Sequence, residues 1–288
     1  MRLAVVADRI GWEERQLMLA ARERGIDTFW VNDTGLCLGP AAAGAPDADV
    51  FLMRSRSYAR CGIIAGLLGD GGARVVNSAT SIGICQDKVT TARALGAVGL
   101  PVLDFRVVLS QQDLAQAIDE FGLPCVLKPV LGGLGRRVLL VRERDVATAA
   151  YEYVEHFGAG FDRVLIAQPY HRGQDERVIV VGSEVVAAYR RIPDGDWRAN
   201  VAVGATVVAA DVTSETKFLC REVTRVTGAE VYALDLFSGD GGHKVVNEVN
   251  HVPLFRGATA ATGASIGAAI AGYLERVMAG DVELTGAR

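Results

Sequence analysis

The strongest constraint in the sequence is a pair of apolar segments near its C-terminal end. Residues 231–237 and 244–250 are rich in β-forming residues, and a glycine-rich segment at 238–242 separates them. Two such segments around a short glycine turn are typical of a β-hairpin. The glycines carry no further information, because a hairpin turn needs them in any case.

Each strand of this predicted hairpin carries polar oxygen atoms in an apolar context. Asp235 interrupts the first segment, and Glu248 and Asn250 interrupt the second. Glu248 and Asn250 are two residues apart and therefore point to the same face of a strand, and pairing of the strands would bring Asp235 beside them. Two carboxylates and an amide suit Mg²⁺, which prefers oxygen ligands. The alternative is a surface hairpin with solvated acids, because acidic side chains are mostly exposed.

Composition limits the class of protein. The 288 residues suffice for one large domain or for two to three compact lobes. A net charge of −4 argues against a nucleic-acid partner, and no apolar segment approaches the ~20 residues of a membrane span. The five cysteines are far apart and form no Cys-x-x-Cys pair, which favours a reducing cytoplasm over disulfides or a zinc site.

The first part of the chain alternates between strand and helix patterns. Strands are expected at 2–7, 28–31, 50–53 and 75–77, with helices at 12–24 and 58–68. This alternation predicts a parallel sheet of the doubly wound type. A nicotinamide oxidoreductase is a remote alternative, because no Gly-x-Gly-x-x-Gly follows the first strand.

The remainder of the chain mixes both element types. Helices are expected at 87–95, 111–121, 145–157, 213–227 and 261–279. Strands are expected at 102–109, 124–129, 138–141, 164–170, 178–181 and 185–190.

A lysine followed by a glycine-rich loop forms the second informative segment. Lys128 lies at the end of the strand at 124–129, and Gly132, Gly133 and Gly135 follow it. Glycines let backbone N–H groups approach an anion, and the lysine supplies a point charge for a phosphate. The loop lacks the Gly-Lys-Ser/Thr ending of a P-loop. A glycine-rich hairpin without a ligand is the alternative.

The order and spacing of several short motifs resemble the ATP-grasp superfamily, and within it the RimK- and LysX-type carboxylate–amine ligases. The resemblance covers nearly the whole chain and is carried by Gln86-Asp87-Lys88, Val126-Leu127-Lys128-Pro129, Asp175-Glu176-Arg177-Val178, Tyr189-Arg190-Arg191, Asp235-Leu236-Phe237 and Asn247-Glu248-Val249-Asn250-His251. Asp8-Arg9-Ile10 near the N-terminus looks like the LysX type.

The resemblance implies an α/β protein with the ATP-grasp fold. Residues 1–86 would form an N-terminal parallel-sheet substrate domain. Two α+β lobes, at 87–165 and 166–288, would hold ATP between them.

The resemblance also implies residue roles. The nucleotide would be bound by Lys88, Lys128, Gly132, Gly133, Gly135, Arg136, Gln168, Pro169, Tyr170 and Asp175. The metal, Mg²⁺ with Mn²⁺ as an alternative, would be held by Asp235, Glu248 and Asn250. The acyl phosphate and a substrate carboxylate would meet Arg177, Arg191, Arg198 and Asn200. For each arginine alone, a solvated surface role is the alternative.

The implied reaction is ATP-dependent amide-bond formation. Transfer of the γ-phosphoryl group would activate a carboxylate as an acyl phosphate, which an amine then attacks. The acid would be glutamate or the C-terminal glutamate of a small acidic carrier protein, and the amine an amino acid. The alternatives are a stand-alone ligase for two small molecules and a non-catalytic nucleotide-binding module. No nucleic-acid or membrane partner is expected, and related ligases are often dimers or tetramers, so a homo-oligomer is expected.

The chain also departs from the RimK and LysX patterns. These ligases have an Arg-Gly-Gly run after the position of Asn200, whereas residues 202–205 are Ala-Val-Gly-Ala. Leu254 stands where the LysX type has an acidic residue before its phenylalanine, and Gln168 replaces the usual acid of the adenine-binding segment. Substrate choice should depend on the N-terminal domain and the loop at 192–210.

Overall fold

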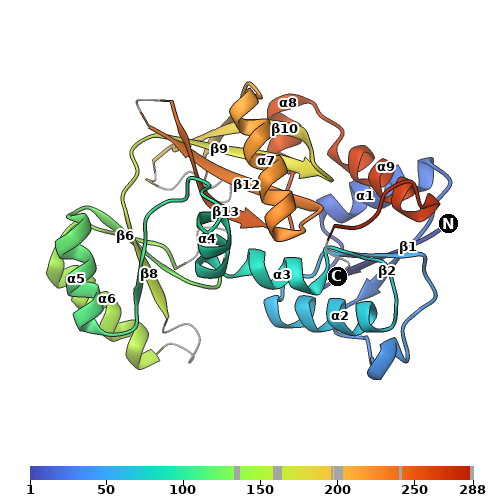
Figure 1. Ribbon diagram of the computed structural model, residues 1–288, viewed down its shortest axis with the longest axis horizontal. Helices are drawn as coiled ribbons and strands as arrows, with labels where there is room; N and C mark the ends of the chain where they lie inside the picture. The colour runs from blue at the N-terminus through green and yellow to red at the C-terminus, as the bar shows by residue number, and fades with distance from the viewer. Residues whose placement is uncertain (133–136, 158–163, 196, 198–203, 240–241, 286–288) are drawn as a thin grey trace.

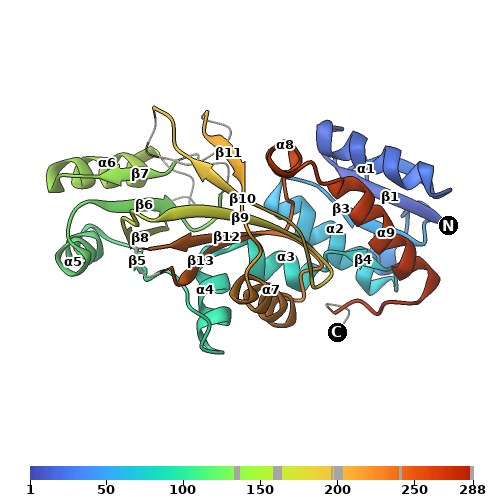
Figure 2. The same cartoon turned by 90° about the horizontal axis from the view of Figure 1, so that it is seen from above.

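A computed structural model describes residues 1–132, 137–157, 164–195, 197, 204–239 and 242–285 (Figure 1). Its strands form three sheets, which follow one another along the long axis of the molecule (Figures 1 and 2). The sheet of the N-terminal part lies at one end, the sheet of residues 106–169 lies at the other, and a five-stranded sheet lies between them.

The first sheet is entirely parallel, as the alternating pattern predicts. Its strands, in spatial order, are β2 (Asp27–Asn32), β1 (Arg2–Ala7), β3 (Val50–Met53) and β4 (Val75–Val76). One face packs on α2 (Tyr58–Asp70) and α3 (Ala79–Gln86), and the other packs on α1 (Trp12–Glu23). Both faces of β1 are buried, which explains its continuous apolar sequence. A short 3₁₀ helix, η1 (Pro40–Ala42), lies between β2 and β3.

The sheet at the opposite end is antiparallel and has four strands. In spatial order they are β5 (Arg106–Val108), β8 (Leu165–Pro169), β6 (Cys125–Pro129) and β7 (Leu139–Val141). The helices α5 (Gln111–Phe121) and α6 (Arg144–Phe157) pack against it, with Leu114, Ile118 and Tyr151 in the shared core.

The central sheet is also antiparallel. In spatial order its strands are β11 (Thr206–Ala209), β10 (Glu184–Ile192), β9 (Gln174–Val181), β12 (Val231–Ser238) and β13 (Lys244–Asn250). One face packs on α4 (Lys88–Gly96) and α7 (Ser214–Thr227) through Leu95, Leu219 and Val223.

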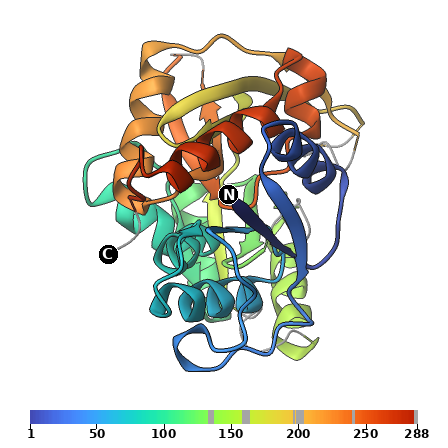
Figure 3. The same cartoon turned by 90° about the vertical axis from the view of Figure 1, so that its right-hand side faces the viewer.

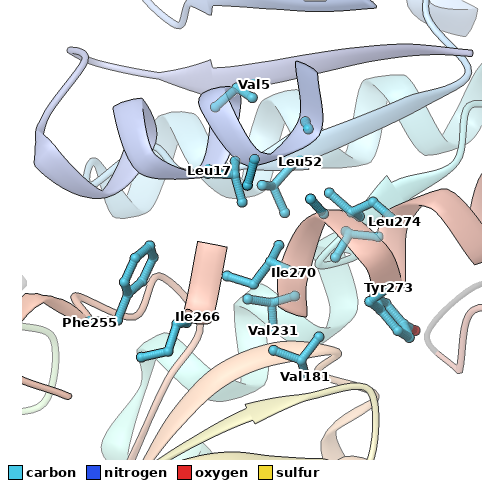
Figure 4. Close-up of a cluster of buried hydrophobic side chains, with 14 of the residues drawn as sticks. Val5, Leu17, Leu52, Val181, Val231, Phe255, Ile266, Ile270, Tyr273 and Leu274 are labelled. Atoms are coloured by element: carbon cyan, nitrogen blue, oxygen red, sulfur yellow. The ribbon is translucent and has the colours of Figure 1, made fainter. Parts of the chain in front are cut away.

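The last helix joins the first sheet to the central one. Ile270 and Leu274 of α9 (Ile266–Ala279) pack between Val5 and Leu52 of the first sheet and Val231 of the central sheet (Figure 4). Figure 3 views the molecule from this end, with α9 beside α1. Because the two sheets share this core, the N-terminal domain is held against the central sheet at one end of the hairpin.

The prediction of one closing helix over 261–279 is wrong. The chain forms α8 (Arg256–Thr262) and then α9, and Gly263 ends α8 with a left-handed φ of 70°. A glycine adopts this conformation without the steric cost that a side chain imposes. Within the described part of the chain, no helix combines the length and apolar character needed to cross a membrane.

The predicted hairpin is confirmed as β12 and β13, and it contains a bulge. Asp235 lies opposite Glu248, but Leu236 lies opposite Val246, so Asn247 is an extra residue in β13. A bulge of this kind bends the strand and changes the direction of nearby side chains. It therefore alters which residues of β13 face the same side as Asp235.

A buried ion pair fastens the segment after this hairpin to the N-terminal domain. Arg54, which follows β3, lies 3.0 Å from the carboxylate of Glu14 and donates from Nη1 to the carbonyl of Pro253 at 2.9 Å. Its side chain is 2% exposed. Removal of one partner of such a pair leaves a buried charge without compensation.

We expect Arg54→Met to lower the free energy of unfolding by about 3 kcal/mol or more, because the Glu14 carboxylate stays buried. Arg225→Met is the control, since Arg225 pairs with Glu222 on the exposed face of α7 and should cost roughly 0.5 kcal/mol or less. Urea unfolding measures both variants. Equal losses in the two would contradict a stabilising role for the Arg54–Glu14 pair.

Candidate active site

A cavity of about 230 Å³ lies between the four-stranded antiparallel sheet and the central sheet. Strands β6 and β8 contribute one wall, and β9, β12 and β13 contribute the other. Ten of the residues named in the sequence predictions line it, and they are Lys88, Lys128, Gly132, Gln168, Pro169, Tyr170, Asp175, Arg191, Asp235 and Glu248. Two sheets facing each other across a cavity can hold an elongated ligand between them.

One end of the cavity is aromatic. Tyr170 and Trp197 meet edge to face with ring centroids 6.1 Å apart, and His171 stacks on Phe237 at 5.1 Å and 10° between planes. Burial lowers the pKa of His171, which favours the neutral ring. Gln168, which is buried at the end of β8, offers an amide beside these rings. This end is suited to a flat heterocycle.

The other end of the cavity is cationic. Lys88 donates to the carbonyl of Gly132 at 2.6 Å, and its Nζ lies 3.6 Å from a carboxylate oxygen of Glu248. Lys128 donates to Oδ1 of Asn247 at 3.0 Å. Lys128 therefore meets the bulged strand from the opposite wall of the cavity, and Lys88 meets it from the start of α4.

Lys128 is almost completely buried. Burial lowers the pKa of Lys128 to about 8, with the charge of Lys88 acting in the same direction and Glu248 opposing both. A buried cation of this kind is favoured when an anion comes close to it. The lysine is thus suited to contact a phosphate.

Acids and arginines alternate across the central sheet. Arg177 donates from Nε and Nη2 to the two carboxylate oxygens of Asp235 at 2.6 Å each. Arg191 donates to Asp175 at 2.7 Å and lies 3.3 Å from Asp235. Arg177 and Arg191 are thus engaged by acids, and their contact with a substrate stays a prediction.

These contacts set the charge of the two acids in opposite ways. Burial raises the pKa of Asp235, but Arg177 and Arg191 outweigh it, so the net shift is downward and the group stays ionised. Burial raises the pKa of Asp175 to about 6, with Arg191 opposing and the charge of Asp235 adding to the rise. As the pH falls, Asp235 therefore keeps its negative charge longer than Asp175 does.

The three predicted metal ligands lie together on the hairpin. Asp235 pairs with Glu248, and the amide of Asn250 lies 3.5 Å from Oδ2 of Asp235. No cluster of three or more His, Cys, Asp or Glu side chains suited to a metal occurs among the residues that the structure describes. Two carboxylates with amide oxygens still fit Mg²⁺, which takes few protein ligands when substrate phosphates complete its shell.

Asn247 is a site residue that the sequence did not single out by itself. The bulge directs it toward Lys128, although simple alternation along β13 would place it on the face opposite to Glu248. No pattern of apolar residues marks a bulge. The only signal in the sequence is that polar residues at 247 and 248 follow the β-branched Val245 and Val246.

A second cavity, of about 720 Å³, lies on the other side of Glu248. The N-terminal domain contributes Asp8, Arg9, Arg56 and Tyr58, and the segment after β13 contributes His251 and Leu254. Gly132 and Glu248 line both cavities. The two cavities therefore meet at Gly132 and Glu248.

The polar groups of the second cavity differ in charge. Arg56 donates to both carboxylate oxygens of Asp8 at 3.0 and 3.2 Å. Burial raises the pKa of Tyr58 to about 12, with Glu248 adding to the rise, so the phenol stays neutral and can donate a hydrogen bond. Burial and the charge of Arg54 lower the pKa of His251 to about 4, so its ring is uncharged.

Several predicted residues lie outside the described part of the chain. They are Gly133, Gly135, Arg136, Arg198 and Asn200. Their predicted contacts with phosphate and substrate stay predictions.

Comparison with known proteins agrees with this geometry. Residues 3–84 match the LysX preATP-grasp domain, and residues 85–274 match the RimK-like ATP-grasp domain. The chain belongs to the RimK-like ATP-grasp family. It is therefore an ATP-dependent ligase that joins a carboxylate to an amine.

Individual relatives match along most of their length. The glutamate–LysW ligase ArgX of Sulfolobus acidocaldarius is 30% identical over 278 residues, which cover 96% of this chain and 98% of that protein. The α-aminoadipate–LysW ligase LysX of Sulfurisphaera tokodaii is 26% identical over 89% of this chain and 92% of its own. A RimK domain ATP-grasp protein of Sphaerobacter thermophilus has a similar structure, with a TM-score of 0.76, 29% identity, and coverage of 96% of this chain and 100% of its own.

The pKa of Lys128 predicts how nucleotide binding depends on pH. The lysine is cationic below about pH 8, so affinity for ADP should be high at pH 7 and fall by up to about tenfold for each pH unit above 8. Lys128→Met should bind weakly at pH 7 and lose this dependence, and Lys217→Met on the exposed face of α7 should behave as wild type. Calorimetric titration with ADP between pH 7 and 9.5 measures this. The same pH profile in Lys128→Met and wild type would contradict the assignment.

Proposed function

We propose that the enzyme transfers the γ-phosphoryl group of ATP to a substrate carboxylate at the junction of the two cavities. The observation that carries this proposal is that Gly132 and Glu248 line both cavities. A nucleotide in the first cavity and a carboxylate in the second would then meet at one place. Proximity of this kind is the main contribution that a protein makes to phosphoryl transfer.

The orientation of ATP follows from the charges in the first cavity. Adenine would lie among Tyr170, His171 and Phe237, because that end is aromatic. The phosphates would lie at Lys88 and Lys128, because the opposite end is cationic. The ribose would then lie between them, near Asp175 on the cavity wall.

Asp235, Glu248 and Asn250 would hold the metal beside these phosphates, with Asn247 next to them. A bound Mg²⁺ or Mn²⁺ would neutralise charge on the phosphate oxygens. The donor set consists of oxygen atoms alone, which is the set that these ions prefer. Lys88 and Lys128 would stabilise the same phosphate charge, and Lys128 would stay protonated below about pH 8.

The second cavity would bind the substrates. Arg9, Arg56 and Arg137 give it positive charge, and Asp8 and Glu248 give it negative charge. Such a mixture suits an amino acid, whose ammonium and carboxylate groups need opposite partners. The neutral Tyr58 hydroxyl, on the same wall, can donate a hydrogen bond to a substrate oxygen.

The proposed chemistry has two steps. A carboxylate oxygen attacks the γ-phosphorus, the bond to the β-phosphate oxygen breaks, and ADP and an acyl phosphate result. The amine nitrogen then attacks the acyl carbon, inorganic phosphate leaves with the carboxylate oxygen, and the nitrogen loses a proton to give the amide. The cations around the junction stabilise the negative charge that develops in both steps.

The proposed substrates are an acidic amino acid, as the amine, and the C-terminal glutamate of a small acidic carrier protein. Relatives with this length and organisation are named for joining glutamate or α-aminoadipate to LysW. Leu254 lines the second cavity where the LysX type has an acid. A ligase for two free small molecules is therefore the second candidate. Assembly as a homo-oligomer stays a prediction.

The test is ADP release with ATP and Mg²⁺ against a panel of amino acids, each with and without a carrier protein that ends in glutamate. Release that requires the carrier is the expected result. Release with two free small molecules would favour the second candidate. Nucleotide binding without ADP release for any pair in the panel would contradict the proposal.

We expect Glu248→Gln to raise the Mg²⁺ concentration needed for half-maximal ADP release by about tenfold or more, because it removes one of two carboxylates from the metal site. Glu222→Gln, which changes an exposed acid of α7, is the matched control and should leave this concentration unchanged. A wild-type Mg²⁺ requirement in Glu248→Gln would refute the metal role of Glu248.

A further inference from the structure

The side chain of Asn77 joins three separate segments of the protein. Asn77 follows β4 at the end of the first sheet and is 1% exposed. Its amide nitrogen donates to the carbonyls of Val231 at 2.8 Å and His251 at 3.0 Å. Its amide oxygen accepts from the backbone N–H groups of Glu230 at 2.6 Å and Val231 at 3.0 Å. All four hydrogen bonds are buried.

These partners lie at the open end of the metal-binding hairpin. The ladder between β12 and β13 has Ala233 opposite Asn250 as its last pair. Val231 is two residues beyond this pair on one strand, and His251 is one residue beyond it on the other. The Asn77 amide, which has the same donor and acceptor groups as a peptide bond, therefore takes the place of a further rung between strands that separate at this point.

Residues at the same end of the first sheet also contact the segment that follows β13. Arg54, after β3, donates to the carbonyl of Pro253, and the ring of Trp12 packs edge to face on Phe255 with centroids 5.8 Å apart. Asn77 differs from these contacts because it bridges both strands of the hairpin. It is thus able to set the distance between the strand that carries Asp235 and the strand that carries Glu248 and Asn250.

We propose that Asn77 is a positioning residue for the metal site, and that its bridge between β12 and β13 sets the affinity for Mg²⁺. The proposal rests on the proposed function, because it takes Asp235, Glu248 and Asn250 as the metal ligands. Asn77 itself lies outside the lining of both cavities and contacts no predicted ligand side chain among the described residues. Its effect would pass through the backbone of Val231 and His251.

Two variants separate the parts of this bridge. Asn77→Ala removes all four hydrogen bonds. Asn77→Asp keeps the size of the side chain and the acceptor for Glu230 and Val231, but it places a second oxygen against the carbonyls of Val231 and His251. If the alanine variant does not fold, the aspartate variant still tests the bridge.

Arg74→Met is the matched control. Arg74 lies three residues before Asn77 and also joins the N-terminal domain to the C-terminal part, by donating from Nη1 to the carbonyls of Val277 and Met278 at the end of α9. Its loss should lower stability without any change at the hairpin. This control distinguishes a general loosening of the domain contact from a change in the metal site.

The experiment measures binding of Mn²⁺ in the presence of saturating ADP, from the loss of the free-ion electron paramagnetic resonance signal, on each folded variant. The Mg²⁺ concentration for half-maximal ADP release is measured in parallel. We expect both asparagine variants to bind the metal about tenfold more weakly than wild type, and Arg74→Met to bind it as wild type does.

The outcomes are distinct. Wild-type metal affinity in folded Asn77→Ala and Asn77→Asp would overturn the positioning role. An equal loss in Arg74→Met would overturn it as well, because the effect would then come from the domain contact in general. Absence of nucleotide-dependent metal binding in the wild-type protein would instead overturn the metal site on which the proposal rests.

Discussion

The arrangement of the site depends on one row of charged side chains across the central sheet. Arg177 of β9 lies opposite Asp235 of β12, which lies opposite Glu248 of β13. Burial of a lone carboxylate would favour its neutral form, but the bidentate contact from Arg177 keeps Asp235 charged. Because the three strands share hydrogen-bonded ladders, the row has the rigidity of the sheet. A metal site on it would be formed before any ligand arrives.

The remaining charges are arranged around this row. Lys128 comes from the other wall of the first cavity and approaches Asn247, and Lys88, at the start of α4, approaches Glu248. The positive and negative side chains of this region partly compensate one another, which lowers the free-energy cost of burying them. The cations are Lys88, Lys128, Arg177 and Arg191, and the acids are Asp175, Asp235 and Glu248. Nucleotide phosphates would add negative charge where cations exceed acids. The same excess of positive charge would thus favour both nucleotide binding and phosphoryl transfer.

The N-terminal domain supplies the second half of the site. The carboxyl ends of β3 and β4 carry Arg54 and Asn77, which hold the segments that begin and end the hairpin. The carboxyl ends of parallel strands are the usual place for ligands in such sheets. Asp8 and Arg9, after β1, and Arg56, after β3, line the second cavity, so the domain that holds the hairpin also lines the proposed substrate site.

Much of this could be predicted from the sequence, and the rest depends on contacts that sequence patterns do not contain. Two β-forming segments around a glycine turn are enough to predict the hairpin, and the two-residue period of a strand together with strand pairing groups Asp235, Glu248 and Asn250. The bulge at Asn247 could not be predicted, because one extra residue in a strand leaves no periodic signal. The pairing of Arg177 with Asp235 requires a register between strands 58 residues apart. The break at Gly263 was missed because glycine is also tolerated within an Ala-rich helix.

The reaction proposed for the junction of the two cavities is transfer of the γ-phosphoryl group of ATP to the substrate carboxylate. Its most direct measurement uses a carboxylate substrate labelled with ¹⁸O, in a pair that supports ADP release, with mass analysis of the products. One ¹⁸O atom is expected in inorganic phosphate, because the acyl phosphate loses its bridging oxygen with the phosphate. Label in AMP, or phosphate free of label, would contradict it.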